Sequence, residues 1–380
     1  MFVTAFVCIL ILNIILIYKG YHIESMVLLT GTSFVLYPLI GPILYIDAIF
    51  VFYLIYSFKK VSFTKNEILF LLILGIPSLI SSFLYTSTSS IFQPLRLFEV
   101  IILYLLISKL SIKKKINSTF FYILFFLGLT SIILHISQIF SYDFAFSIKP
   151  IKSFYIGGWF KDSAQMGPFY LILFLWVYNT ENFKFSKKII LLLLFAINVA
   201  ISSNRTSLLI LIIVITFIII SKLSFKLLII SAVLSFLFIY NIEFFGTKIF
   251  KTYTAIIQGN FKFDTLTLRI NNWTKIYSYA IDNCNIFFGC GYGLIENNAI
   301  KLKSTVGTFT FDNMFVRYFI ENGLIGGFIK TLIYIIFLAK SNINYLIPII
   351  LLAMTQESTE DLILFLPTIF LLFTNFKQHV

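Results

Sequence analysis

Apolar segments separated by short hinges run through this chain, and the pattern is broken only once. From residue 1 to about residue 240 the segments follow one another closely, whereas residues 241–311 are polar and rich in aromatic side chains. The sequence FDNMFVRYFIENGLIGG at residues 311–327 then leads back into apolar segments. This pattern predicts a polytopic membrane protein with one large loop outside the membrane, and that loop is the first place to look for function.

The composition excludes an ordinary soluble fold. Hydrophobic residues make up 59% of the 380 residues and charged residues only 12%, whereas soluble domains carry roughly 25% charged residues. Most apolar segments have about 13 to 21 residues, close to the ~20 that an α-helix needs to cross the hydrocarbon core, and helices satisfy their own backbone groups in lipid. We expect one integral membrane domain over residues 1–380, an all-α transmembrane bundle of about 12 helices (11–13), with residues 241–311 as its long extracytoplasmic loop. The candidate spans are residues 2–18, 25–37, 43–58, 68–85, 95–108, 120–140, 164–179, 189–202, 206–221, 227–240, 324–339, 345–354 and 362–373.

The lysines indicate which side of the membrane each hinge faces. Basic hinges occur at residues 59–65, 109–115, 184–188 and 222–226. They fall at every second hinge, as the positive-inside bias requires of cytoplasmic loops. The net charge of +13 therefore reflects topology and does not indicate nucleic acid, and the long loop is expected on the outward face, away from cytosolic nucleotides.

The cysteines and one helical pattern bear on the long loop. Three cysteines are too few for a disulfide scaffold. Cys284 and Cys290 could pair if the loop faces an oxidising compartment, but we expect free thiols. Residues 268–282 are expected to form a helix, because the spacing of Arg269, Trp273 and Ile276 places them on one helical face.

Three arginines are candidates for binding an anion. Arg205 stands in SSNRTS between two apolar segments, where a charge costs roughly 2.5 to 3.5 kcal/mol and usually has a partner or a ligand; an arginine that reaches lipid headgroups is the alternative. Arg269 and Trp273 suit a phosphate next to a sugar ring, or else a helix lying on the membrane surface. Arg317 and Glu321, at positions i and i+4, are expected to form a helix ion pair.

Two further motifs combine glycines with polar residues. Gly289, Gly291 and Gly293 have GxGxG spacing with no strand before them, which excludes a Rossmann or P-loop site and favours sharp turns or close approach of backbone to a ligand. Asp312 and Asn313 precede the next span, and Asp312 is either a base or a helix N-cap. The sequence has no zinc-ligand spacing and no Ser–His pattern, so no metal is expected.

In this order the motifs resemble the O-antigen polymerase (Wzy) and O-antigen ligase superfamily of bacterial envelope enzymes. SNRT at residues 203–206 is similar to the S-R-[TS] element of the family, and FGCGYG at residues 288–293 resembles its F-G-x-G-x-G segment. DN at residues 312–313 followed by ENGLIG at residues 321–326 resembles its H-N…E-x-G-x-x-G signature. The resemblance covers residues 189–336. Asp312 stands where ligases typically carry histidine, which favours the polymerase branch.

The resemblance implies a multi-pass inner-membrane enzyme that joins undecaprenyl-diphosphate-linked repeat units on the periplasmic face without a cofactor. Asp312 would be the general base, and Arg205 and Arg269 would bind the diphosphate. The implied substrate-binding residues are Arg317, Trp273, Gly289, Gly291, Tyr292, Gly293, Asn313 and Glu321. The implied partners are the lipid-linked oligosaccharide, membrane lipid and a chain-length regulator, with no nucleic acid.

Three alternatives stay open. A ligase would transfer the glycan to lipid A-core instead of to another repeat unit. A flippase for the same lipid-linked oligosaccharide would suit about 12 helices, but carriers tend to have matching halves and the single late loop breaks such symmetry. An outward-facing acyl- or phosphotransferase would usually need a histidine or metal cluster on that face.

Overall fold

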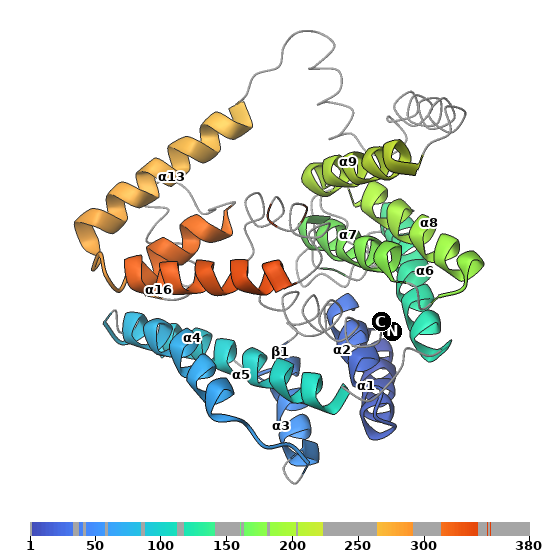
Figure 1. Ribbon diagram of the computed structural model, residues 1–380, viewed down its shortest axis with the longest axis horizontal. Coiled ribbons are helices and arrows are strands. Elements are labelled where there is room, and N and C mark those ends of the chain that lie inside the picture. Colours follow the sequence, from blue (N-terminus) through green and yellow to red (C-terminus); the bar gives the residue numbers. More distant parts are fainter. Residues whose placement is uncertain are drawn as a thin grey trace. The chain divides into compact units, whose positions relative to one another are not determined.

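The computed structural model describes residues 2–32, 38–40, 43–57, 60–84, 88–111, 118–140, 160, 163–180, 183–202, 204–222, 264–291, 313–340, 348 and 350. These residues are mostly helical (Figure 1). The helices are α1 (Phe2–Tyr18), α2 (His22–Gly31), α3 (Tyr45–Ser57), α4 (Lys65–Leu84), α5 (Thr88–Ser111), α6 (Ser118–Phe140), α7 (Ser163–Asn179), α8 (Phe185–Ile201), α9 (Arg205–Lys222), α13 (Asp264–Asn283) and α16 (Met314–Lys340). Two short strands, β1 (Pro38–Ile40) and β2 (Ile43–Leu44), pair antiparallel at the hinge before α3.

The helical class is confirmed, and the number of membrane spans remains a prediction. Among the described residues, Ser118–Ser137 is the one helical stretch that is both long and apolar enough to cross a membrane. Shorter apolar helical stretches cover Cys8–Tyr18, Ile101–Leu110 and Thr206–Ile218. The predicted span at residues 227–240 lies outside the described residues, as does nearly all of the last two, at residues 345–354 and 362–373.

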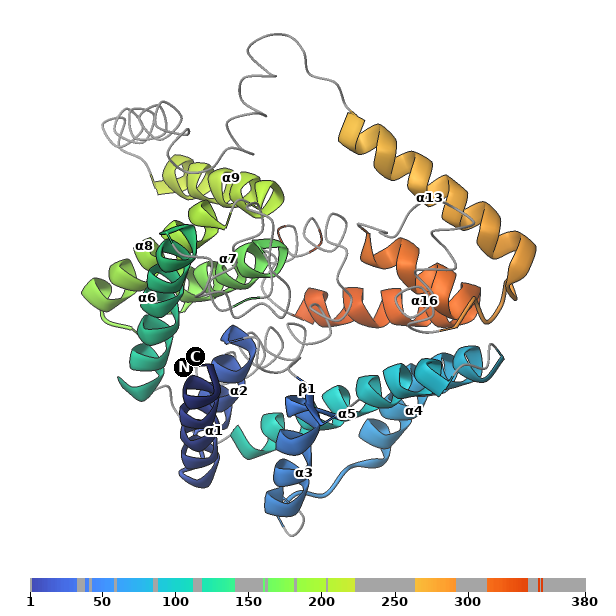
Figure 2. The ribbon, with the colours of Figure 1, turned by 180° about the vertical axis from the view of Figure 1, so that it is seen from behind.

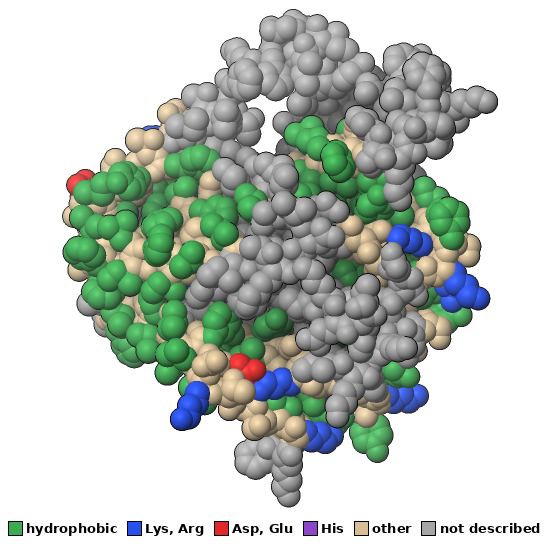
Figure 3. Space-filling view, viewed as in Figure 1, with side chains coloured by type: hydrophobic (Ala, Val, Ile, Leu, Met, Phe, Trp, Pro, Cys, Tyr) green, Lys and Arg blue, Asp and Glu red, His purple; other side chains and the backbone are tan. Residues whose placement is uncertain are grey.

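Many helix faces that are not packed against other helices are apolar. Exposed side chains on α6 and α8 include Tyr122, Phe126, Leu129, Ile133, Ile136, Ile190, Leu193 and Ile197. Figure 3 shows hydrophobic side chains spread over α4, α13 and α16 as well. Exposed apolar surface on this scale marks contact with a membrane or with another apolar partner.

The chain divides into two compact units. Unit 1 comprises Met1–Ile15, Val27–Ser33 and Lys115–Lys262, and unit 2 comprises Leu16–Met26, Phe34–Lys114 and Phe263–Val380. Helices α6 to α9 therefore belong to unit 1, whereas α3, α4, α5, α13 and α16 belong to unit 2.

In unit 1, α7 is the central helix. Its residues 165–177 are all buried, as expected of a helix that is hydrophobic all round. Figures 1 and 2 both show α8 next to it. The hydroxyl of Tyr170 donates to the carbonyl of Leu127 on α6 (2.9 Å), and the amide of Asn198 on α8 donates to the carbonyl of Gly128 (3.0 Å). Polar side chains thus fix the contacts of α6 with α7 and with α8.

In unit 2, the start of α4 is held by a capping box. The backbone N–H of Thr64 donates to the Glu67 carboxylate (2.7 Å), while the Thr64 hydroxyl accepts from the N–H of Glu67 (3.4 Å). Lys109 at the end of α5 pairs with Glu67 (2.6 Å) and also donates to the carbonyl of Ser62. Burial by itself would raise the pKa of Glu67, but the hydrogen bonds from Lys109 and Thr64 outweigh it and lower the pKa below its ordinary value. One lysine thereby ties two adjacent helix ends together.

Small residues allow α4 to contact both of its neighbours closely. A Cβ placed on Gly75 would overlap the ring of Phe98 on α5, with the nearest ring carbon at 1.7 Å. On α16, a Cβ on Gly326 would lie 3.0 Å from the Cβ of Pro77 on α4. Residues 323–327 of α16 therefore pack against the second half of α4.

Candidate functional site

The SSNRTS motif forms the turn between α8 and α9 in unit 1. Asn204 caps α9, because its side-chain oxygen accepts from the N–H of Ser207 (2.9 Å), and the Ser202 hydroxyl accepts from the N–H of Asn204 (3.3 Å). A Cβ on Gly167 of α7 would lie 2.7 Å from the Cβ of Asn204 and 2.8 Å from the Ser202 hydroxyl. The motif thus fixes Arg205 as the first residue of α9; its side chain lies outside the described residues.

The predicted loop helix is confirmed as α13 in unit 2. Ile276 is 1% exposed and packs with Cys290 and Ile320, while Trp273, one turn earlier, is half-buried. Of the three residues predicted to share a face, Ile276 is the one whose contact with α16 the structure describes. The side chain of Arg269 is not among those described.

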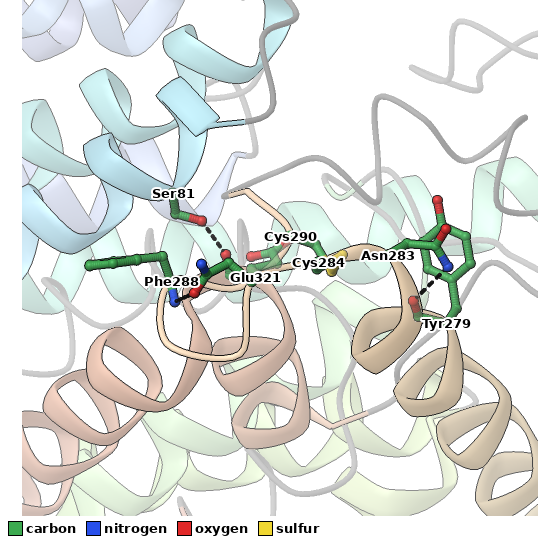
Figure 4. The surroundings of a disulfide bond; sticks show 8 residues. Ser81, Tyr279, Asn283, Cys284, Phe288, Cys290 and Glu321 are labelled. Carbon is green, nitrogen blue, oxygen red and sulfur yellow. Dashed lines mark hydrogen bonds between the residues drawn. A yellow bond between two sulfur atoms is a disulfide. The ribbon is translucent and has the colours of Figure 1, made fainter.

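The expectation of free thiols in this loop was wrong. Cys284 and Cys290 form a disulfide, with their Cα atoms 4.9 Å apart (Figure 4). The two residues meet because the chain between them closes a tight turn, in which the N–H of Gly289 donates to the carbonyl of Asn285 (2.6 Å). The Asn285 side chain stabilises this turn by accepting from the N–H groups of Phe287 (2.9 Å) and Phe288 (3.2 Å). We call residues 284–291 the glycine loop.

The glycine loop lies against a break in α16. Gly323 has φ 65° and ψ −168°, which interrupts the helix. In a continuous α-helix the N–H of Leu324 would donate to the carbonyl of Ile320, and that of Ile325 to the carbonyl of Glu321. The break separates these donors from these acceptors, and buried backbone groups without partners are costly.

The glycine loop supplies the missing partners. The N–H of Cys290 donates to the carbonyl of Ile320 (2.8 Å), and the N–H of Gly291 donates to that of Glu321 (3.0 Å). The carbonyl of Glu321 also accepts from the hydroxyl of Ser81 on α4 (Figure 4). The carbonyls of Ile320 and Glu321, on the N-terminal side of the break, are therefore both satisfied by groups from outside α16.

The donors on the other side of the break are satisfied in the same way. The N–H of Leu324 donates to the carbonyl of Ile286 (2.9 Å), and the N–H of Ile325 donates to that of Phe287 (3.2 Å). Four hydrogen bonds to the loop thus take the place of the two helical bonds that Leu324 and Ile325 would otherwise make.

The two backbones come together at glycines. A Cβ on Gly289 (φ +76°) would lie 2.3 Å from the backbone nitrogen of Gly323, and a Cβ on Gly323 would lie 2.3 Å from the carbonyl carbon of Phe287. The close backbone approach predicted for the glycine motif is therefore made to α16.

Polar side chains line the first half of α16. The side-chain oxygen of Asn313 accepts from the N–H groups of Phe315 (2.9 Å) and Val316 (3.1 Å), so the N-cap that we considered for Asp312 is made by Asn313. The predicted ion pair is confirmed: Arg317 Nε donates to Glu321 Oε1 at 2.9 Å, with both side chains buried. The helix therefore carries a mutually neutralised pair one turn before the break.

A second buried polar pair escaped the sequence analysis. Lys330 is 5% exposed, and its Nζ donates to the side-chain oxygen of Asn322 (2.9 Å) across the break. The side-chain amide of Asn322 donates in turn to the carbonyl of Tyr318 (3.2 Å). A lone lysine in an otherwise apolar segment was the available signal, because such charges usually face the bundle interior.

The structure brings some of the candidate site residues together and does not describe others. Trp273, Gly289, Gly291, Asn313, Arg317 and Glu321 all lie on α13, the glycine loop and α16. Asp312, Tyr292 and Gly293 lie outside the described residues. Arg205 belongs to unit 1 and Arg269 to unit 2. No group of three or more metal-binding side chains occurs in the described part of the chain.

Residues 190–330 match the family model of the O-antigen ligases. This region of the chain is similar to the O-antigen ligase/polymerase superfamily. The match covers less than half of the chain and takes in the SSNRTS turn, α13, the glycine loop and the break in α16, so it confirms the resemblance noted over residues 189–336. No curated protein and no solved structure matches the chain.

Proteins of this superfamily share three general properties. Its members are integral proteins of the bacterial inner membrane, they are glycosyltransferase-like enzymes, and they act on lipid-linked glycans. The exposed apolar faces of the helices agree with residence in a membrane. The superfamily includes both ligases and polymerases.

Replacing Gly323 with alanine is expected to undock the glycine loop. A Cβ at this position meets the Phe287 carbonyl, and φ and ψ of Gly323 lie in a region that only glycine adopts readily, where another residue costs roughly 1 to 3 kcal/mol. About tenfold faster reduction of the disulfide is therefore expected. The measurement exposes native membranes to a phosphine reductant and counts the freed thiols by maleimide–polyethylene glycol gel shift, in a Cys8→Ser background.

Leu324→Ala is the matched control, because this neighbouring side chain is 52% exposed and its loss leaves the backbone hydrogen bonds intact. Equal reduction rates for Gly323→Ala and the parent protein would mean that the docking does not protect the disulfide.

Proposed function

We propose that the protein is a polysaccharide polymerase that joins undecaprenyl-diphosphate-linked repeat units on the periplasmic face of the inner membrane. The observation that carries this proposal is Asp312 at the position where ligases typically have histidine, within a region that matches the family. The disulfide supports the outward orientation, because such bonds persist in oxidising compartments. A glycosyl transfer outside the cytosol has no access to cytosolic nucleotides, so its glycan donor must already be activated. A glycan linked to a lipid diphosphate is such a donor.

The proposed reaction is a glycosyl transfer with a diphosphate leaving group. The acceptor hydroxyl gives its proton to Asp312 and forms a new bond to the anomeric carbon of the donor glycan, while the bond from that carbon to the diphosphate oxygen breaks. Undecaprenyl diphosphate departs with the electron pair. Arg205 and Arg269 stabilise the negative charge that develops on it, which is the kind of electrostatic assistance that often dominates catalysis.

The described side chains suit supporting roles in this proposal. Trp273, half-buried on α13, offers an aromatic face to a sugar ring, one turn from Arg269. The positive charge of Arg317 is neutralised by Glu321. We therefore assign Arg317 to shaping the site and not to binding the diphosphate by itself. Asn313 caps the start of α16 and directly follows Asp312 in the sequence.

A ligase is the second candidate, because the matching family model is that of the O-antigen ligases. Deletion of the gene separates the candidates when surface glycan is run on a silver-stained gel. Lipid A-core carrying a single repeat unit is the result expected for a polymerase, since export and ligation survive. Bare core would instead indicate a ligase or a flippase, and plasmid-borne wild-type protein must restore the ladder in either case.

Loss of either proposed catalytic arginine is expected to abolish polymer. Arg205→Ala and Arg269→Ala should each leave a single repeat unit on the core, while immunoblots show normal amounts of protein in the membrane. Lys275→Ala is the matched control for Arg269→Ala, because it also removes a cation from α13, at an exposed position. Long glycan from either arginine variant would remove that arginine from the mechanism.

Asp312→Asn is expected to lower the polymerisation rate by about 10²- to 10⁴-fold, the usual contribution of a general base. The cap of α16 is made by Asn313, so this substitution leaves the helix start unchanged. The rate is measured with purified protein and lipid-linked repeat units, and Asp282→Asn, an exposed carboxylate on α13, is the control. Unchanged activity of Asp312→Asn would exclude the base role.

A further inference from the structure

The tip of the glycine loop exposes large apolar side chains next to an apolar stripe on α16. Ile286 is 56% exposed and Phe287 is 58% exposed. Both residues lie next to the break, because their carbonyls accept from the N–H groups of Leu324 and Ile325. These hydrogen bonds fix the position of the loop tip along the axis of α16.

The stripe continues along the second half of α16. Leu324, Ile325, Phe328, Leu332 and Ile335 are 43% exposed or more. Phe328 follows Leu324 by four residues and Ile325 by three, and Leu332 and Ile335 continue at spacings of four and three, so all five lie on one helical face. The polar side of the same half-helix is buried, with Lys330 only 5% exposed. In an integral membrane protein, a helix with an exposed apolar face and a buried polar one turns the apolar face to lipid.

We propose that Ile286 and Phe287 form an apolar wedge inserted into the outer leaflet of the bilayer. The occupant of this surface is lipid, because the wedge continues the lipid-facing stripe of α16 without interruption at Leu324. The glycine loop from Cys284 to Gly291 contains no charged residue, and its one polar side chain, that of Asn285, is used within the turn. Nothing in the loop tip therefore favours water over lipid.

The loop is built to insert without a large entropic cost. The disulfide and the four hydrogen bonds to α16 hold it in one conformation, so little further ordering is required on contact with lipid. The wedge in turn holds the broken helix at the level of the lipid headgroups. This inference requires membrane residence and does not depend on which glycosyl transfer the protein catalyses.

Tryptophan quenching by brominated lipid tests the wedge in the full-length protein. Phe287→Trp is compared with wild type in vesicles whose phosphatidylcholine is brominated either near the headgroup or deep in the acyl chain. We expect the emission added by the new tryptophan to be blue-shifted and quenched at least twofold, more strongly by the shallow bromines. The difference from wild type removes the contribution of the three native tryptophans.

Two further variants bracket the result. Ser278→Trp places the probe on an exposed position of α13 away from Ile276, where aqueous iodide and not bromolipid should quench it. Leu324→Trp marks the top of the stripe and should be quenched by bromolipid. Quenching of Leu324→Trp without quenching of Phe287→Trp would overturn the wedge, and absence of quenching in both would overturn the lipid-facing stripe on which it depends. A gel-shift assay of the disulfide confirms that each variant keeps the loop closed.

Discussion

Unit 2 depends on the exchange of hydrogen bonds between the glycine loop and the break in α16. Lipid offers no partner to a free N–H or carbonyl, so a broken helix at membrane depth requires replacements from the protein. Here four of the groups released by the break, the carbonyls of Ile320 and Glu321 and the N–H groups of Leu324 and Ile325, have backbone partners in the loop at 2.8 to 3.2 Å. The disulfide holds the loop in the conformation that provides them. The break and the loop are therefore one structural feature, although about thirty residues separate them in the sequence.

The buried side chains around the break follow from this feature. The half-helix that ends at Asn322 presents the negative end of its dipole, which favours a nearby cation. Lys330 lies there and donates to Asn322 from the second half of α16, while Arg317 and Glu321 neutralise each other one turn before the break. A helix broken at Gly323 thus carries three buried ionisable side chains in a short stretch, each of which has a hydrogen-bond partner.

Patterns within one helical segment were predicted correctly, and contacts that require a turn or a break in the chain were not. The positions of most helices, the i, i+4 ion pair of Arg317 and Glu321, and the face shared by Trp273 and Ile276 all depend on spacing within one segment, which the sequence displays directly. The disulfide was missed because Cys284 and Cys290 meet only after Asn285 closes the turn between them. The hydrogen bond from Lys330 to Asn322 forms across the break at Gly323. Hydropathy does not reveal this break, because the residues on both sides of Gly323 are compatible with a continuous helix.

The same exchange of hydrogen bonds changes how the two glycine motifs should be understood. Considered separately, each of the two motifs, F-G-x-G-x-G and E-x-G-x-x-G, could be explained by the close approach of a ligand to its glycines. In the structure, Gly289 of the first motif and Gly323 of the second exclude side chains from a single backbone contact, and Asn285 and Ser81 stabilise its surroundings. The contact accounts for both glycines by itself, so neither glycine motif requires a ligand to explain it. Each motif is half of one structural element that joins the loop after α13 to α16.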